Sequence, residues 1–401
     1  IDHTGYLPKL VKEGFTGKIY CTEATASLME LMLLDSAKLQ EEEAEWAKKK
    51  GYSKHASPQP LYGIEEAKRA LQQRMSAHYE SIISITDKIS FQFHNAGHIL
   101  GSAFVELILH GDSQDKRIVF SGDLGRKDHP LLYPPEPIKN ADILLVESTY
   151  GNRNNIHNDI KEELATSVLE ALDKGGCILI PSFAVGRTQL LMYYLQQLIE
   201  SKRIPSIPIY IDSPMAINAT EIYKKHDDYH KLGKEASADY SFCDFPELHF
   251  YKDQEASNSL NNIKSNAIII SASGMCTGGR ILHHLYNRLN RENDTLLFVG
   301  YQAIGTRGRK ILEGEETVKI FGLQVPVKCQ IKEITGLSAH ADMSELLTWL
   351  STSNEPPKRT FIVHGEEDSA NDFKRTIQRE LGWNNVTVPN YMESFELFKG
   401  I

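Results

Sequence analysis

The chain has 401 residues, of which 41% are hydrophobic and 24% charged, and its formal net charge at pH 7 is -9. This length exceeds what one hydrophobic core usually supports, so we expect about two domains with an ordinary globular composition. The acidic balance excludes a generally basic surface that binds nucleic acid non-specifically, although a local basic groove is compatible with it.

The five cysteines are widely spaced and form no CxxC pair, which predicts neither a disulfide scaffold nor a thiolate zinc site. No apolar run approaches the roughly 20 residues that a membrane span needs, and the first residues show no signal-peptide pattern. We therefore expect a cytoplasmic protein with no membrane partner.

In chain order, the first predicted element is a charged, surface-exposed helix over residues 24–50. From residue 89 to 147, short apolar runs alternate with turns, a pattern that predicts a sheet with short connections. From residue 158, helices and strands alternate through residue 299, as in a doubly wound parallel sheet. Short strands return after residue 315, followed by a helix from residue 341 and a strand ending at residue 364. We predict one domain from residues 1–157 and 316–401, with a second α/β domain, residues 158–315, inserted into it.

Residues that can bind a metal or transfer a proton are spread along this chain, several of them where apolar runs end: Asp2, His3, His98, Asp123, Glu147, His340 and His364. Such positions are exposed yet rigid, and His and carboxylate ligands without cysteine suit a catalytic zinc site. The glycines around His98 favour a ligand over a structural histidine. Asp123 alone would equally fit an Asx turn. Together the residues indicate a dinuclear metal hydrolase.

The motifs around these residues resemble those of a known family. AGHILGSA with His98, FSGDLGR with Asp123, and Asp2-His3 as the tail of a His-x-His-x-Asp-His signature resemble the metal motifs of the metallo-β-lactamase fold. VESTYG with Glu147, SAHAD with His340 and VHGE with His364 resemble the additional motifs of the β-CASP nucleases, which process nucleic acids. The resemblance covers nearly the whole chain. It implies an α/β fold, an αββα metallo-β-lactamase sandwich with an inserted doubly wound β-CASP domain.

The resemblance also implies two zinc ions. Their ligands would be Asp2, His3, His364 and a bridging Asp123 for one ion, and His98 with Asp123 for part of the other site. The two upstream histidines of the signature are absent, so we expect the numbered chain to omit an N-terminal segment.

The same resemblance assigns the catalytic roles. Asp2 and Asp123 would orient a metal-bound hydroxide, and His340, held by Glu147, would protonate the leaving oxygen. The alternative for His340 is a structural histidine that only hydrogen-bonds Glu147.

Small residues and arginines in Gly-containing loops are candidate contacts for substrate phosphates: Ser271, Ser273, Gly274, Arg187, Arg280 and Arg307. A plain strand-to-helix turn is the alternative for Ser271–Met275, and surface solubility is the alternative for each arginine. The segment Gly14–Lys18 lacks P-loop spacing and the inserted domain lacks GxGxxG, so we expect no nucleotide cofactor.

In the family, the RNA-processing branch carries a histidine at the position of His364. The resemblance therefore implies a zinc-dependent ribonuclease that hydrolyses single-stranded RNA, as an endonuclease or also as a 5′-3′ exonuclease. A DNA nuclease, another hydrolase of this fold and a catalytically silent RNA-processing subunit remain open alternatives, and so does a homodimer.

Overall fold

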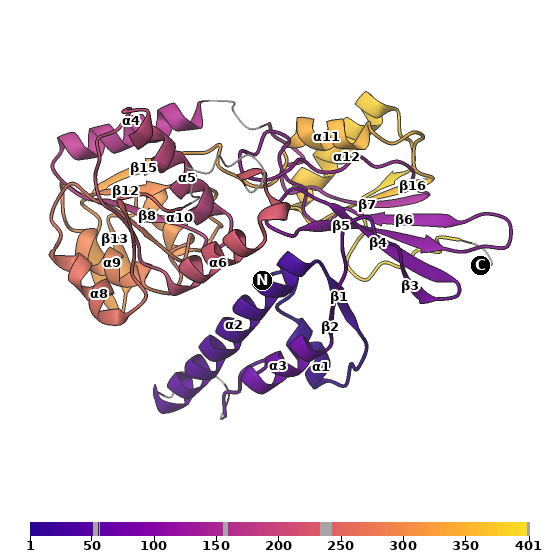
Figure 1. The fold of residues 1–401 in the computed structure, drawn as a ribbon, viewed down its shortest axis with the longest axis horizontal. Helices are drawn as coiled ribbons and strands as arrows, with labels where there is room; N and C mark the ends of the chain where they lie inside the picture. Colours follow the sequence, from indigo (N-terminus) through magenta and orange to yellow (C-terminus); the bar gives the residue numbers. More distant parts are fainter. Residues whose placement is uncertain (51–54, 56, 155–158, 233–242, 399–401) are drawn as a thin grey trace.

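The computed structural model describes residues 1–50, 55, 57–154, 159–232 and 243–398. Two α/β lobes lie side by side, and a smaller helical unit lies beneath the gap between them (Figure 1). Across the described residues, no helix combines the length and the apolar character that a membrane span requires.

The first lobe is built on a seven-stranded mixed sheet in the order β17-β16-β7-β6-β5-β4-β3. The strands from β3 to β6 are antiparallel, whereas β6, β7, β16 and β17 run parallel. Their bounds are β3 Ile83–Thr86, β4 Ile89–Asn95, β5 Ala103–Leu109, β6 Lys116–Phe120, β7 Ile143–Glu147, β16 Arg359–Val363 and β17 Val386–Thr387.

Both faces of this sheet are apolar because its central strands carry hydrophobic residues at successive positions. On β7, Leu144 and Val146 pack with Trp349 of α11 (Met343–Leu350) and with Phe373 of α12 (Glu367–Leu381). Ile143 points to the opposite face, where it packs with Phe361 of β16 and with Phe395. The two helices therefore cover one face of the sheet.

The second lobe contains a six-stranded parallel sheet in the order β10-β9-β11-β8-β12-β15, which confirms the predicted doubly wound sheet. Its strands are β8 Ile178–Pro181, β9 Ile209–Ile211, β10 Leu248–Phe250, β11 Ile268–Ser271, β12 Thr295–Phe298 and β15 Gln330–Glu333. Its helices are α4 Ile160–Asp173, α5 Arg187–Glu200, α6 Pro214–Lys225, η1 Asp227–Tyr229, α8 Gln254–Ser259, η2 Leu260–Asn262, α9 Ile281–Arg288 and α10 Arg307–Leu312.

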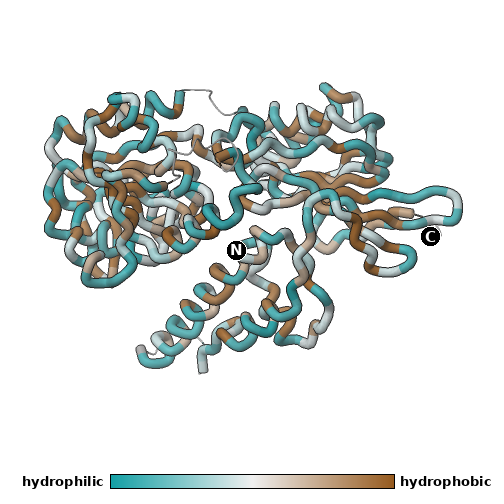
Figure 2. The backbone as a smooth tube through the Cα atoms, viewed as in Figure 1, coloured by the Kyte–Doolittle hydropathy of each residue, from teal (hydrophilic) through white to brown (hydrophobic). Residues whose placement is uncertain are grey.

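Helices cover both faces of the second sheet, and the strand side chains alternate between them. Ile178 and Ile180 of β8 pack in the core formed with α4, α5 and α6. Leu179, between them, packs in the core formed with α9 and α10. In Figure 2 the apolar segments accordingly gather inside this lobe.

The hairpin of β13 (Thr317–Ile320) and β14 (Leu323–Pro326) packs with the second lobe, because Val318, Ile320 and Val325 complete the core under α9 and α10. Strand β15 then pairs with β12. The sheet of the second lobe thus continues past the boundary predicted at residues 315 and 316, and we propose that the inserted domain ends after Glu333. The other predicted boundary, between residues 157 and 158, lies outside the described residues.

The helical unit packs against both lobes. It comprises α1 Leu7–Lys12, β1 Ile19–Cys21, α2 Glu23–Lys50, α3 Ile64–Gln72 and β2 Arg74–Ser76. Near the start of α2, Ala24 and Leu28 join the core that contains Tyr223 of α6, and Ser27 Oγ lies 2.9 Å from His226 Nε2. The other end of α2 projects away from both lobes (Figure 1). This docking places the first residues of the chain between the lobes.

Candidate metal centre

Three adjacent parallel strands bring predicted site residues to one edge of the first sheet. Asp123 follows β6, Glu147 ends β7 and His364 follows β16. Because the carboxyl ends of parallel strands meet at the same edge, residues far apart in sequence become neighbours there. His98 reaches this edge from the loop between β4 and β5.

The loops at this edge are held together by main-chain contacts. A Cβ atom at Gly125 would overlap with the carbonyl of Gly97, so only glycine permits this approach. Gly125 N donates to Ala96 O at 2.8 Å, and Ala341 N donates to Leu124 O at 2.8 Å. The loops that carry His98, Asp123 and His340 are therefore fixed relative to one another.

His364 occupies a strained backbone conformation, with φ of 51° in the left-handed region. Ser148 supports this turn: its N–H donates to His364 O at 3.2 Å, and its hydroxyl donates to Val363 O at 3.0 Å. The turn holds His364 Nδ1 3.3 Å from Asp123 Oδ1.

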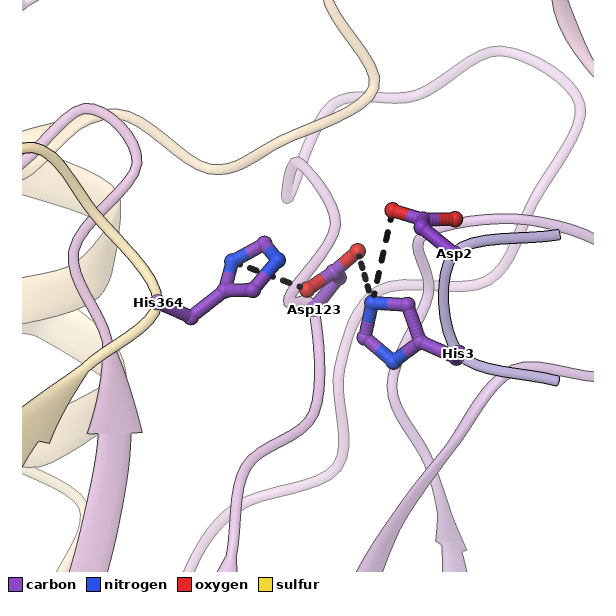
Figure 3. A group of neighbouring side chains, drawn as sticks. All are labelled: Asp2, His3, Asp123 and His364. Atoms are coloured by element: carbon purple, nitrogen blue, oxygen red, sulfur yellow. Dashed lines mark ion pairs between the residues drawn. The ribbon is translucent and has the colours of Figure 1, made fainter. Parts of the chain in front are cut away.

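The first group of candidate ligands is Asp2, His3, Asp123 and His364, whose ligand atoms lie within 4.8 Å of one another. In Figure 3, Asp123 lies between His3 and His364, and all four side chains converge. His3 Nε2 is 3.0 Å from Asp123 Oδ2 and 3.8 Å from Asp2 Oδ2. The structure thus brings together the four residues expected to share one metal ion.

The second group consists of His98, Asp123 and His340. His98 Nε2 lies 3.7 Å from Asp123 Oδ2, and the His98 and His340 rings are 4.3 Å apart. Asp123 belongs to both groups, so its carboxylate has the position expected of a bridging ligand. His340, which we expect to be a proton donor, also has a ring nitrogen close enough to His98 and Asp123 to serve as a metal ligand.

The protonation states of these residues suit a cation. Burial raises the pKa of Asp123, but the hydrogen bond from His3 and the neighbouring imidazoles outweigh it and hold that pKa well below its usual range. Burial lowers the pKa of His98 to about 4, so its ring is neutral at pH 7. Among the described residues, buried Asp123 Oδ1 accepts no hydrogen bond. An ionised Asp123 carboxylate beside the neutral imidazole of His98 fits a divalent metal such as zinc.

The Glu147 carboxylate is fully buried and holds His340. Its Oε1 accepts from Leu124 N at 2.6 Å and lies 3.2 Å from His340 Nδ1, while its Oε2 accepts from Thr149 N at 3.3 Å. Burial lowers the pKa of His340, but the hydrogen bond and charge of Glu147 raise it above its usual value overall. His340 Nδ1 therefore donates to Glu147, and Nε2 is the nitrogen left for other chemistry.

A cavity of about 1060 Å³ opens over the candidate ligands. The second lobe forms its other wall where β8 and β11 are neighbours but lead into α5 and α9 on opposite faces of the sheet. Such a switch point leaves a crevice at the carboxyl ends of the strands. Phe183, Ser273 and Tyr301 line the cavity from the loops after β8, β11 and β12.

Two of the predicted phosphate contacts, Arg187 and Ser273, line this cavity. Burial lowers the pKa of Arg187 to about 10, and in the described part of the chain no carboxylate lies within 4.0 Å of its guanidinium. A desolvated cation without an internal counter-ion is suited to bind an anionic substrate.

Other predicted phosphate contacts have internal partners and lie outside the cavity lining. Arg280 Nη1 donates to buried Asp212 at 2.7 Å, and Arg307 donates to the carbonyls of Lys319 and Cys276. The hydroxyl of Ser271 donates to Asp212 O at 2.9 Å. Gly274 also lies outside the lining, and its carbonyl accepts from Gln302 Nε2.

Several cavity residues were not singled out from the sequence. Thr149 Oγ1 is 3.3 Å from His364 Nδ1, and the Tyr150 ring lies 6.0 Å from that of His340. Arg153 and Tyr301 also line the cavity. Thr149 and Tyr150 lie in the VESTYG motif, whereas the signal for Arg153 and Tyr301 was position, because each follows a predicted strand end.

Two family models match the chain. The Beta-Casp domain matches residues 188–311, and the Zn-dependent metallo-hydrolase RNA specificity domain matches residues 324–389. The first match falls in the second lobe, and the second runs from the β13–β14 hairpin back into the first lobe.

Similar proteins cover most of this chain. It is 35% identical to Ribonuclease TTHA0252 of Thermus thermophilus, over 92% of this chain and 80% of that protein. It is 30% identical to an RNase J-like protein of Methanocaldococcus jannaschii, over 98% of this chain and 84% of that one. The transcription termination factor FttA of the same archaeon is 31% identical, but the chain spans only 59% of its length.

These matches confirm the fold and the family that the motifs indicated, and with them a metal-dependent hydrolase. The chain belongs to the β-CASP family of RNA nucleases with the metallo-β-lactamase fold.

Proposed function

We propose that this protein is a zinc-dependent ribonuclease that hydrolyses phosphodiester bonds of single-stranded RNA. The observation that carries the proposal is the Asp123 carboxylate, which is common to two groups of metal ligands beside the Glu147–His340 pair. A relative named as a ribonuclease and the RNA specificity domain support RNA as the substrate.

Asp2, His3, Asp123 and His364 would hold one zinc ion, and His98 with Asp123 would contribute to the site of a second. When bound, zinc supplies Lewis-acid chemistry, because it acidifies water and neutralises charge on a phosphoryl group. The all-nitrogen and oxygen donor set and the name of the matching family model support zinc.

The ionised Asp123 and the exposed Asp2 carboxylate are the acceptors available to orient an attacking water. Asp2 opens into the cavity and is therefore accessible to both water and substrate. A water that is already oriented for attack lowers the entropic part of the activation barrier.

His340 supplies the proton that the leaving oxygen needs. Glu147 accepts from Nδ1, which fixes the ring, and it raises the pKa of His340 so that the ring holds a proton more readily. The proton on Nε2 is then the one that moves to the substrate. Glu147 acts on the reaction through His340.

Arg187 and Ser273, on the wall opposite the ligands, would bind phosphates of the substrate strand. The cavity is lined by residues of both lobes, and a single strand is the substrate form we propose for it. The expected endonuclease or 5′-3′ exonuclease mode, homodimer and cytoplasmic location stay predictions.

The test is cleavage of end-labelled RNA and DNA single strands of one sequence by the zinc-loaded full-length protein. We expect RNA cleavage in wild type and loss of about 10²-fold or more in rate for His340→Ala, with zinc content unchanged. Preferential DNA cleavage would show a DNA nuclease instead. A zinc-loaded protein that cleaves neither strand would be the catalytically silent alternative.

A further inference from the structure

Arg153 and Tyr301 come from different lobes and meet in the cavity. The guanidinium carbon of Arg153 lies 4.0 Å from the ring centroid of Tyr150 and 5.8 Å from that of Tyr301. Arg153 and Tyr150 follow β7 of the first sheet, whereas Tyr301 follows β12 of the second. The cavity thus has a flat cation on one side and a flat ring on the other.

Neither group is closed off by the protein. Tyr301 is 41% exposed, and Arg153 is also exposed. Both line the cavity of about 1060 Å³, so part of their surface opens into it. Within the described residues, no carboxylate lies within 4.0 Å of the Arg153 guanidinium, which faces the rings of Tyr150 and Tyr301.

The distances from the Arg153 guanidinium to the two tyrosine rings differ. At 4.0 Å, Arg153 and Tyr150 are in stacking contact, which fixes the guanidinium. At 5.8 Å, Arg153 and Tyr301 are not closed on each other. A planar group needs roughly 7 Å between two stacking surfaces, so Tyr301 has to move away from Arg153 to admit one.

This pair lies beside the proposed proton donor. The Tyr150 ring that supports Arg153 also contacts His340, with ring centroids 6.0 Å apart. A group bound on Arg153 and Tyr301 would therefore be attached close to the oxygen that His340 protonates. In a nucleic acid strand, that group is the base of a nucleotide flanking the cleaved bond.

We propose that Tyr301 and Arg153 form a stacking subsite for the nucleobase of one nucleotide adjacent to the scissile phosphate. Tyrosine rings and guanidinium planes stack on unpaired bases, and this contact tolerates different bases because each has a π face. The subsite fits the base of a single strand, since a paired base is stacked within its duplex. The inference rests on the proposed ribonuclease function.

Abasic substitution separates this contact from all others. A set of single-stranded RNAs carries one abasic nucleotide at each position flanking the cleaved bond in turn, and kcat and KM are measured with the zinc-loaded full-length protein. The variants are Tyr301→Leu, Tyr301→Phe, Arg153→Lys and Arg153→Ala. Tyr286→Leu is the matched control, because Tyr286 is 40% exposed and lies outside the cavity lining.

We expect one position at which loss of the base raises the KM of the wild type about 10-fold. Tyr301→Leu should raise the KM for intact RNA by a similar factor and leave the KM for that abasic RNA unchanged. Tyr301→Phe should resemble the wild type, whereas Arg153→Lys should lose part of the base dependence because it keeps the charge but not the plane. Tyr286→Leu should have no effect.

If Tyr301→Leu raises the KM of intact and abasic RNA equally, or changes neither, the subsite does not exist. RNA cleavage by the wild type is required in either case, so its absence would contradict the proposed function rather than the subsite.

Discussion

Glu147 Oε1 and His340 Nδ1 lie 3.2 Å apart, and the other hydrogen bonds that this buried carboxylate accepts from described residues come from the main-chain amides of Leu124 and Thr149. The carboxylate therefore has no cationic partner other than His340 among the described residues. The protonation of His340 at Nδ1 thus depends on the Glu147 side chain.

Glu147→Gln keeps the shape of the side chain and removes its charge. We expect cleavage to fall about 10²-fold with unchanged zinc content, because an uncharged partner no longer favours the protonated ring. Single-turnover RNA cleavage measures this rate. The double variant with His340→Ala should be no slower than His340→Ala alone, and additive losses would contradict the coupling.

The loop contact at Gly125 should be essential for the ligand geometry. Gly125→Ala forces a Cβ into the Gly97 carbonyl, and we expect unfolding free energy to fall by about 2 to 3 kcal/mol, with weaker zinc binding. Gly278→Ala is the control, because a Cβ there has open space. Urea unfolding of both variants measures the difference, and equal stabilities would show that the loops can separate without cost.

His94 is expected to stabilise the fold below about pH 9. Its Nδ1 and Nε2 lie 3.1 Å from Glu136 and 3.0 Å from Glu106. Burial lowers the pKa of His94, but these two carboxylates outweigh it and raise that pKa to about 9. Arg117 also faces Glu106 and shares its charge.

Because the folded-state pKa of His94 lies above its unfolded value of about 6.5, its contribution is complete below pH 6.5 and is lost as pH rises toward 9. A shift from 6.5 to about 9 corresponds to about 3 kcal/mol. His94→Gln should therefore destabilise the protein strongly at pH 6 and much less at pH 9.5 in urea unfolding. The same loss at both pH values would contradict a charged His94.

Much of the fold could be predicted from the periodicity of apolar residues. The buried runs that became β6, β7 and β16 end at Asp123, Glu147 and His364, and strand ends can be read locally. The doubly wound sheet was likewise visible in the alternation of helices and strands. The β13–β14 hairpin was predicted to belong to the first lobe but packs in the core under α9 and α10, because short strands do not show which core they complete.

The predicted phosphate contacts could not be distinguished from the sequence alone. Arg187 and Arg280 both follow small residues in loops, yet Arg187 opens into the cavity and Arg280 is bound by Asp212, 68 residues earlier. No local pattern distinguishes them, because the partner is brought in by tertiary packing. Tyr301 and Arg153 were missed for the same reason, since their contact joins two lobes.

We propose that the Asp123 carboxylate would contribute to both zinc sites. Zinc per chain, measured by atomic emission on the full-length protein after dialysis, tests it most directly. We expect about two zinc ions in the wild type and fewer than one in Asp123→Asn, with the exposed Asp112→Asn as an unchanged control. A wild type that binds no zinc at saturating concentration, or an Asp123→Asn variant that keeps both ions, would contradict the account.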